Sequence, residues 1–285
     1  MSTETLTTVE AVQAALMADG TPAKAEQMAR YMRAVPGGYG EGDRFHGLTM
    51  PQMRALAKRT VLDDNELGWL VASPWHEDRM VALLVAVGQV VPLNRLLARQ
   101  REGRVGRAAA PAKVEAARAR QAELGGMYLE WVRRGYVNNW DLVDASAEHL
   151  VGPWLLEPLC DRGAGGAGCS TPPPLPAEIS RLLASDSVWE RRVAVMSTFA
   201  TTRAGTDWPT YAVAALLLDD SHDLIHKAVG WMLREAGKRV DEEALRGFLD
   251  VHAAAMPRTM LRYAIERLDP EARAHYLGLP RRPRR

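Results

Sequence analysis

A tryptophan and an aspartate lie four residues apart in the segment NNWDLVD, residues 138–144. In a helix this spacing places Trp140 and Asp144 on one face. Leu142 and Val143 lead the apolar face, so Trp140 lies at its border and Asp144 lies beyond it, facing out. An indole beside a carboxylate can hold an electron-poor sugar or base and stabilise positive charge that develops on it. The alternative for Asp144 is a surface acid in solvent or in a salt bridge.

A second segment, residues 221–238, is an amphipathic helix with a tryptophan among the cations of its polar face. Lys227, Trp231, Arg234 and Lys238 follow one another at spacings of four, three and four, opposite an apolar stripe. Cations beside an exposed aromatic ring suit a ligand with phosphates and flat groups, and nucleic acid is the obvious candidate. The alternative is an ordinary solvated helix face, with the ring packed against a neighbouring helix.

A third segment, VWERRVAV at residues 188–195, places a tryptophan and an arginine about one turn apart. We expect Trp189 to pack in the core, as large aromatic residues usually do. The guanidinium of Arg192 has the reach and the fork of donors to bind Asp144 or a phosphate. The alternative for Arg192 is an exposed surface charge.

The composition limits the class of protein. The chain has 285 residues, 47% of them apolar, and a formal net charge of +1, so it is globular and any nucleic-acid surface must be local. Neither Cys160 nor Cys169 has a metal-ligand neighbour, so we expect no zinc site, no other metal and no disulfide framework. We find no leader-like N-terminus and no apolar run of membrane length, which predicts a soluble protein in the cytoplasm.

Apolar residues recur at spacings of three and four along nearly the whole chain, and no alternating strand-like run occurs. This pattern predicts an all-α protein with helices over residues 8–17, 24–35, 51–59, 63–72, 76–91, 115–134, 140–150, 176–184, 188–198, 208–218, 223–238, 241–252, 256–268 and 270–277. Ser187 and Glu190 have the spacing of a capping box, and Asn138 or Asn139 can cap the helix that begins at Trp140. Short paired helices indicate an α-solenoid of divergent HEAT-like repeats with a concave basic cleft.

We expect one domain over residues 1–285, with three stretches that depart from the helical pattern. They are a basic insertion at about residues 98–120, a Gly/Pro-rich loop at about residues 161–176, and a basic tail at residues 281–285. The loop is expected to connect helices within the domain. The insertion is either the solvated end of an Ala-rich helix or an additional arm that contacts phosphates.

Several motifs occur in a fixed order. NNWDLVD is followed by VWERRVAV, HKAVGWMLREAGK and MPRTMLRYAIERL, and preceded by KAEQMARYMR, FHGLTMPQMRALAKR and WHEDRMVAL. This ordered set resembles the DNA alkylation repair family of HEAT-like-repeat DNA glycosylases, the AlkD type, over about residues 24–268. The basic insertion and the Gly/Pro loop are additions to the compact family pattern.

The resemblance implies roles only for the matched positions. A catalytic pocket around the deoxyribose of the damaged nucleotide is implied for Trp140, Asp144 and Trp231. A contact with the DNA backbone is implied for Arg192, and a place in the lining of the same cleft for Tyr31. Phosphate contacts are implied for Lys227, Arg234 and Lys238.

The activity that the resemblance implies is that of a monofunctional DNA glycosylase. Such an enzyme hydrolyses the N-glycosidic bond of cationic N3- or N7-alkylpurines in duplex DNA, without a metal or other cofactor and without flipping the base. A cationic alkylpurine leaves readily, so Asp144 has only to stabilise the developing positive sugar and orient water. The expected partner is double-stranded DNA carrying alkylated purines, with no membrane, and the protein is expected to act as a monomer.

Two further hypotheses stay open. A site without a base pocket tolerates large adducts, so the substrates can include bulky adducts of a DNA-alkylating natural product, as in self-resistance. Alternatively, the chain is a non-catalytic HEAT-like-repeat protein that binds bent, branched or damaged DNA. A pure protein-interaction scaffold fits the basic and aromatic helix face less well.

Overall fold

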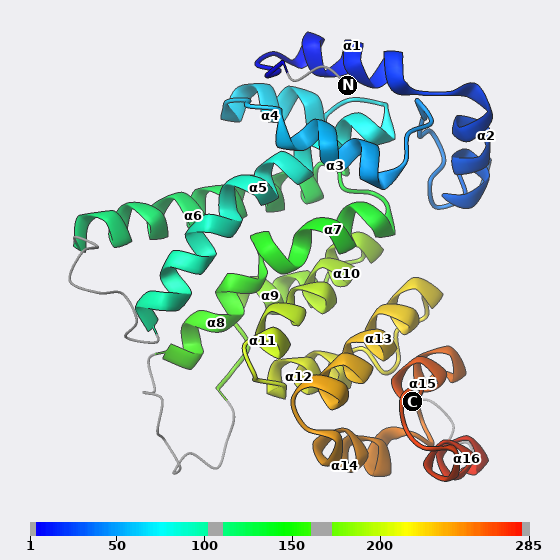
Figure 1. Ribbon diagram of the computed structural model, residues 1–285. Helices are drawn as coiled ribbons and strands as arrows, with labels where there is room; N and C mark the ends of the chain where they lie inside the picture. The colour runs from blue at the N-terminus through cyan, green and yellow to red at the C-terminus, as the bar shows by residue number, and fades with distance from the viewer. Residues whose placement is uncertain (1–3, 102–110, 161–172, 281–285) are drawn as a thin grey trace. The chain divides into compact units, whose positions relative to one another are not determined.

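The structure is a computed structural model, and it describes residues 4–101, 111–160 and 173–280 (Figure 1). The basic tail, residues 102–110 of the basic insertion and residues 161–172 of the Gly/Pro loop lie outside the described residues. Contacts between Cα atoms divide the chain into two compact units, Met1–Ser146 and Ala147–Arg285. The boundary falls inside α7, and the single domain over residues 1–285 stays a prediction.

Both units are built from helices, and the described residues contain no strand beyond two isolated bridges, which confirms the all-α class. Unit 1 contains α1 (Val9–Asp19), α2 (Pro22–Tyr31), α3 (Met50–Lys58), α4 (Asp64–Val71), α5 (His76–Arg101), α6 (Pro111–Arg133) and the start of α7 (Trp140–Leu150).

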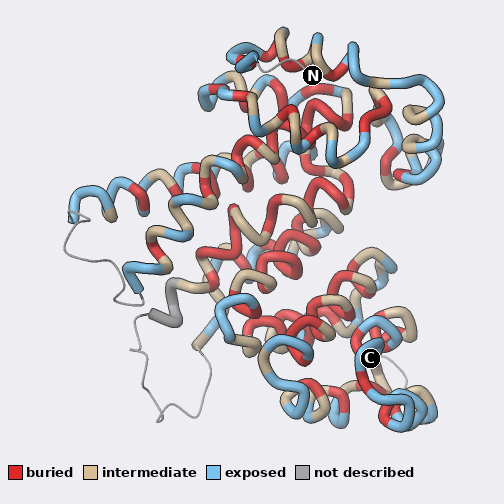
Figure 2. The backbone as a smooth tube through the Cα atoms, viewed as in Figure 1, coloured by how far each residue is buried: buried red, intermediate tan, exposed pale blue. Residues whose placement is uncertain are grey.

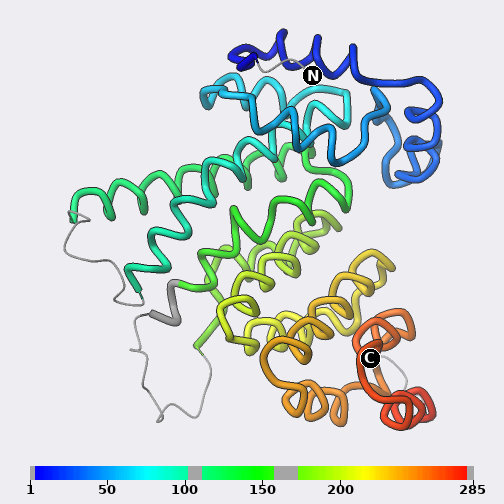
Figure 3. The backbone as a smooth tube through the Cα atoms, in the orientation of Figure 1, coloured from blue at the N-terminus to red at the C-terminus, as the bar shows by residue number. Residues whose placement is uncertain are grey.

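Unit 2 holds the shorter helices of the second half of the chain, which Figure 3 traces in order. They are α8 (Gly152–Cys160), α9 (Ala177–Leu183), α10 (Val188–Ser197), α11 (Phe199–Arg203), α12 (Trp208–Leu216), α13 (Asp223–Arg239), α14 (Glu242–His252), α15 (Arg258–Ala264) and α16 (Pro270–Gly278). The sequence pattern predicted all of these except α8 and α11, which is only five residues long.

The predicted end of α5 is wrong. The sequence pattern predicts a helix over residues 76–91, yet α5 continues to Arg101 with Pro92 inside it. The residues after Pro92 are good helix formers and extend the helix into the basic insertion. At the other end of the insertion, Arg120 lies on α6 and its Nη2 pairs with the Oδ1 of Asp64 at 2.5 Å. These described ends are therefore helix, and Arg120 is already paired within unit 1.

The capping box predicted at the start of α10 is also wrong. The side chain of Ser187 makes no capping hydrogen bond. Its backbone N–H, the group that Glu190 would have accepted, donates to the Oγ of Ser185 at 3.0 Å. The carboxylate of Glu190 instead pairs with Arg181 at 3.2 Å. Arg181 thus binds the carboxylate that the capping box would have used. The spacing of Ser187 and Glu190 gives no sign of this contact.

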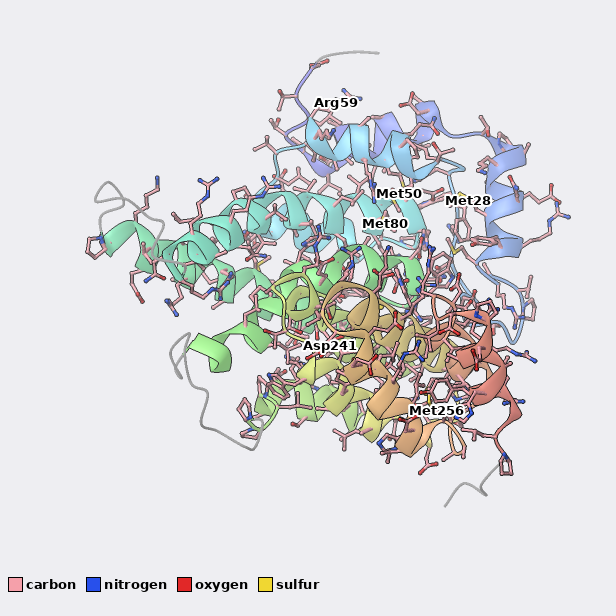
Figure 4. All side chains as sticks on the ribbon, turned by 60° about the horizontal axis from the view of Figure 1, so that its bottom comes forward. Met28, Met50, Arg59, Met80, Asp241 and Met256 are labelled. Atoms are coloured by element: carbon pink, nitrogen blue, oxygen red, sulfur yellow. The ribbon has the colours of Figure 1, made fainter. Side chains whose placement is uncertain are left out.

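By length and composition alone, α5 could cross a membrane, contrary to the sequence expectation that no run was long enough. Its first half is buried, as Figure 2 shows, and α3, α4 and α6 pack against the helix. Met80, labelled in Figure 4, is fully buried at the centre of this packing. The apolar character of α5 is that of a core helix, which passes the same length test.

The first turn of α5 buries four polar side chains in succession, residues 76–79. The carboxylate of Glu77 accepts hydrogen bonds from the backbone N–H groups of residues 46–48, at 2.9 to 3.2 Å. Asp78 accepts a hydrogen bond from the Oγ of Ser73 at 2.6 Å. Acids in the first turn also suit the positive end of the helix dipole. These hydrogen bonds hold the start of α5 against residues 46–48 and against Ser73.

His76 and Arg79 join two carboxylates in a buried group that we name the α5 ion cluster: Asp43, His76, Arg79 and Asp141. The Nδ1 of His76 lies 3.1 Å from Asp43 Oδ2, and its Nε2 lies 2.9 Å from Asp141 Oδ2. Arg79 Nη2 lies 2.6 Å from Asp43 Oδ1. The four side chains are between 0% and 9% exposed. Because carboxylates only accept hydrogen bonds, both ring nitrogens donate and His76 is an imidazolium.

The pKa values follow from this geometry. Burial alone lowers the pKa of His76, but the charge of Asp141 and the hydrogen bonds to Asp141 and Asp43 outweigh it and raise the pKa to about 9. Burial raises the pKa of Asp43, yet the hydrogen bond from His76 and the charge of Arg79 hold it below its usual value. A histidine whose pKa rises on folding stabilises the fold fully below its unfolded pKa, and this stabilisation disappears as the pH rises through the folded pKa.

We therefore expect the free energy of unfolding to fall between pH 6.5 and pH 9, by on the order of 3 kcal/mol from His76 alone. Urea denaturation at a series of pH values measures this slope. His76→Gln should remove most of it. His252→Gln is the matched control, because burial lowers the pKa of His252, the direction opposite to that of His76. Equal slopes in wild type and His76→Gln would contradict the assignment.

In unit 2, α13 is the central helix, and α10, α14 and α15 pack against it. Asp241, labelled in Figure 4, caps α14 by accepting the backbone N–H of Glu243 at 2.9 Å. Gly230 is the position where α15 comes closest to α13. A methyl group there would overlap the carbonyl oxygen of Met260 and lie 2.6 Å from the Cβ of Tyr263. The packing of α15 therefore requires glycine at this position.

We expect Gly230→Ala to lower the free energy of unfolding by about 1–3 kcal/mol, since α15 must move away from α13. Gly247→Ala is the control. Gly247 is an exposed glycine inside α14 with open space around it, so alanine should be neutral or stabilise by up to about 1 kcal/mol. Chemical denaturation of both variants measures the difference in the free energy of unfolding. Equal stabilities would show that α15 moves away from α13 at little cost in free energy.

Candidate functional site

Tyr31 and Trp140 form an aromatic pair on unit 1, which we call the Tyr31–Trp140 pair. Their ring centroids lie 5.8 Å apart with planes at 83°, an edge-to-face contact. Tyr31 is the last residue of α2 and is 66% exposed, whereas Trp140 is the first residue of α7 and is half-buried. The structure thus brings together two of the residues that the sequence resemblance implied for one cleft.

The start of α7 is fixed beneath the Trp140 ring. Asn139 Oδ1 accepts the backbone N–H of Trp140 at 2.9 Å, so Asn139 is the residue that caps this helix. Gly40 lies between the segments that carry the two rings. A Cβ at position 40 would overlap the carbonyl oxygen of Met32, next to Tyr31, and lie 3.3 Å from Asn139 Nδ2. Only a residue without a side chain allows this approach.

Asp144 follows Trp140 by one turn of α7 and is half-buried. Beneath it, the hydroxyl of Ser146 lies 3.0 Å from the Tyr128 hydroxyl and 2.5 Å from the carbonyl oxygen of Leu142. Burial raises the pKa of Tyr128, the bond with Ser146 opposes this, and the charge of Asp144 adds to it. The phenol of Tyr128, near the Asp144 carboxylate, therefore stays protonated and neutral.

On unit 2, α13 carries the predicted stripe of cations around Trp231. Lys227 pairs with Asp223 at 2.7 Å, and the hydrogen bond from this lysine lowers the pKa of Asp223. Both partners are well exposed, so the pair is worth little and exchanges easily. Trp231 is half-buried and Lys238 is exposed. These three residues fit the prediction of a polar face that presents an aromatic ring.

Arg234 departs from that prediction. Its side chain is only 18% exposed, and its guanidinium pairs with Glu266 and with Glu235. Glu266 follows α15, the helix that packs closely on α13, so tertiary packing brings an acid onto the predicted phosphate ligand. A phosphate at Arg234 would have to displace a carboxylate.

Arg192 is buried, so the alternative of an exposed surface charge is wrong. It is 4% exposed, and its Nη1 donates to the carbonyl oxygen of Leu224 in the first turn of α13 at 2.6 Å. This bond fixes the direction of one guanidinium branch. Trp189, expected in the core, is only half-buried.

The α5 ion cluster is the feature that sequence reasoning missed. Neither the motifs nor their spacing assign a role or a partner to His76. The only local signal is a run of four polar residues, HEDR, between Trp75 and Met80 in an otherwise apolar helix. Asp43 and Asp141 lie far away in the sequence and cannot be paired with it by spacing. Within the described residues, no group of three His, Cys, Asp or Glu side chains could hold a metal ion.

The arrangement has a defined chemical capacity. The helix α7 presents an aromatic face and a carboxylate one turn apart, and a second, exposed ring lies against the first. Such a face can contact an apolar sugar and stabilise positive charge upon it. The lysines of α13 can bind phosphates.

Comparisons with known proteins identify the family of the chain. A family model described as DNA alkylation repair enzyme matches residues 12–268. A solved structure described as a predicted DNA alkylation repair enzyme from Enterococcus faecalis has a TM-score of 0.57 and 16% identity, over 88% of this chain and 98% of that chain. At this identity the structural match supports the fold alone. No curated protein matches the chain. Because the family match covers most of its length, the chain belongs to the family of DNA alkylation repair enzymes.

Proposed function

We propose that this protein is a monofunctional DNA glycosylase that hydrolyses the N-glycosidic bond of cationic N3- and N7-alkylpurines in double-stranded DNA. The observation that carries the proposal is the half-buried face of α7, where the Trp140 indole contacts the exposed Tyr31 and lies one turn from the Asp144 carboxylate. Membership of the DNA alkylation repair family supports DNA as the substrate. We also propose that the fold is a HEAT-like solenoid with a concave basic cleft. The protein acts as a monomer, and it does not flip the damaged base out of the duplex.

In the proposed reaction the bond between C1′ of the deoxyribose and the purine nitrogen breaks, and its electron pair leaves with the base. The alkylated purine carries a positive charge, so it departs neutral and needs no general acid. Asp144 stabilises the positive charge that develops on the sugar, against the ring face of Trp140. Water then adds to C1′ and gives its proton to Asp144. None of the proposed catalytic residues carries an amine, so no Schiff base forms with the sugar.

The other assigned residues bind the duplex. The proposal gives Trp231 the role of a second indole at the sugar, and gives phosphate contacts to Lys227, Arg234 and Lys238. The proposal gives Arg192 a contact with the DNA backbone, which requires this buried side chain to turn outward. Lys238 is exposed, and the Lys227–Asp223 pair is open to solvent, so these lysines need little rearrangement. Arg234 needs more, because Glu266 already holds it.

We expect Asp144→Asn to lower single-turnover excision of N7-methylguanine at least about tenfold, equivalent to about 1.4 kcal/mol of transition-state stabilisation. The amide keeps the shape of the side chain but loses the charge that stabilises the sugar. Release of free base from alkylated duplex DNA measures the rate. Glu115→Gln, a neutralised exposed acid on α6, is the control for a general change in charge. An unchanged rate in Asp144→Asn would remove this carboxylate from the mechanism.

The second candidate is a non-catalytic protein that binds bent, branched or damaged DNA, which the exposed basic face of α13 also suits. Formation of abasic sites in alkylated DNA separates the two functions, because a binding protein produces no alkali-labile sites. The substrate range is tested in the same assay. Comparable excision of N7-methylguanine and of a bulky N7-guanine adduct would support the hypothesis of self-resistance to a DNA-alkylating natural product.

A further inference from the structure

We propose that His76, Asp43 and Asp141 are positioning residues for the Tyr31–Trp140 pair, because the α5 ion cluster joins the two chain segments on which the rings stand. The cluster is connected to the rings through the backbone of these two segments. Its effect on the reaction rests on the proposed function. Its effect on the geometry of the pair does not.

The segment after Tyr31 is tied to the cluster at Asp43. The chain folds back after α2, where the backbone N–H of Gly40 donates to the carbonyl oxygen of Arg33 at 3.2 Å. Three residues later, Asp43 binds both His76 and Arg79 through its two carboxylate oxygens. The position of Tyr31 therefore follows from a short loop with a buried ion pair at its far end.

The segment that carries Trp140 is tied to the same cluster on both sides of the ring. Two residues before it, Asn138 Oδ1 accepts a hydrogen bond from Arg79 Nη1 at 2.7 Å. One residue after it, the Oδ2 of Asp141 binds His76 Nε2 at 2.9 Å. The other oxygen of Asp141 accepts the backbone N–H of Leu142 at 2.9 Å, which fixes the carboxylate to the first turn of α7.

The proton on His76 determines whether the two segments attract or repel each other. Asp43 comes from the Tyr31 segment and Asp141 from the Trp140 segment, and the imidazolium lies between them. With His76 charged, two cations and two anions cancel. Without that charge, two buried carboxylates face each other across a neutral ring with only Arg79 to compensate. Such repulsion in a buried site is weakly screened. We therefore expect the segments to separate and the edge-to-face contact to change.

Fluorine NMR of protein labelled with 5-fluorotryptophan tests this inference without any assay of activity. The chain has eight tryptophans, and loss of one signal in Trp140→Phe identifies the resonance of Trp140. We expect this resonance to shift in His76→Gln and in Asp141→Asn. In the wild type it should titrate with a midpoint near pH 9, and in His76→Gln this titration should be absent. Repeating the titration in Tyr31→Phe excludes the phenol as the titrating group.

The matched control is His46→Gln. His46 is also a buried histidine paired with an aspartate, Asp78, at 2.9 Å. Its ring stacks on Trp75 at 4.1 Å, and no contact of its side chain with residues 138–141 is seen. We expect His46→Gln to shift the Trp75 resonance and to leave that of Trp140 in place. A Trp140 resonance at its wild-type position in folded His76→Gln, with an unchanged titration, would overturn the inference.

Gly40→Ala tests the same coupling with every charge retained. The added methyl must push Met32 or Asn139 away, so the Trp140 resonance should shift while its titration near pH 9 remains. Gly88→Ala, at an exposed glycine of α5 with open space around it, should leave the Trp140 resonance unchanged. A shift of equal size in both glycine variants would contradict a specific role for the loop.

Activity then separates positioning from stability. His76→Gln should lower kcat for excision by at least about tenfold under conditions where the variant is fully folded, with KM nearly unchanged, because the rings are misplaced rather than removed. His46→Gln should keep the wild-type kcat. Wild-type protein without glycosylase activity would refute the proposed function and leave the fluorine results standing. An active wild type with no fluorine coupling would refute the positioning role alone.

Discussion

The imidazolium of His76 lies between two carboxylates that are far apart in the sequence, and unit 1 depends on this contact. Burying four ionisable side chains costs solvation free energy, which their mutual attraction recovers only when every partner is in place. Removal of one partner leaves an uncompensated charge in the interior. The α5 ion cluster therefore contributes more to the specificity of the fold than to its stability. Its ion pairs form only when the segments that carry Asp43, Arg79 and Asp141 adopt this arrangement.

The same principle does not apply to the cations of α13. Arg234 is only 18% exposed and is held by Glu266, but the Lys227–Asp223 pair is exposed on both sides. Pairs of this kind contribute little to stability and exchange partners easily. Unit 1 thus contains charges that are locked by burial, whereas the Lys227–Asp223 pair of α13 is accessible to solvent. This contrast suits the proposed function, in which the reacting groups are held while the phosphate ligands adapt.

Sequence reasoning predicted the helices well where local signals suffice. The start of α7 at Trp140 and the span of α13 follow from apolar spacing and capping residues alone, although the spacing left Asn138 and Asn139 open as the cap of α7. It failed where a distant residue decides the outcome. Glu190 pairs with Arg181 in place of the predicted capping box. The helix α5 continues through Pro92. At the site, the contact of Tyr31 with Trp140 came only through family resemblance, and the partners of His76 could not be found because no spacing relates residues 43, 76 and 141.

The close approach at Gly230 has a consequence for engineering the protein. Every substitution there introduces a side chain where the backbone of α15 already lies, so the position is closed to variation. The adjacent polar face of α13 is different, since Lys238 projects into solvent and contributes nothing to the core. A library restricted to that face could vary the charge of the helix over a wide range, while the glycine keeps each member of the library in the same fold.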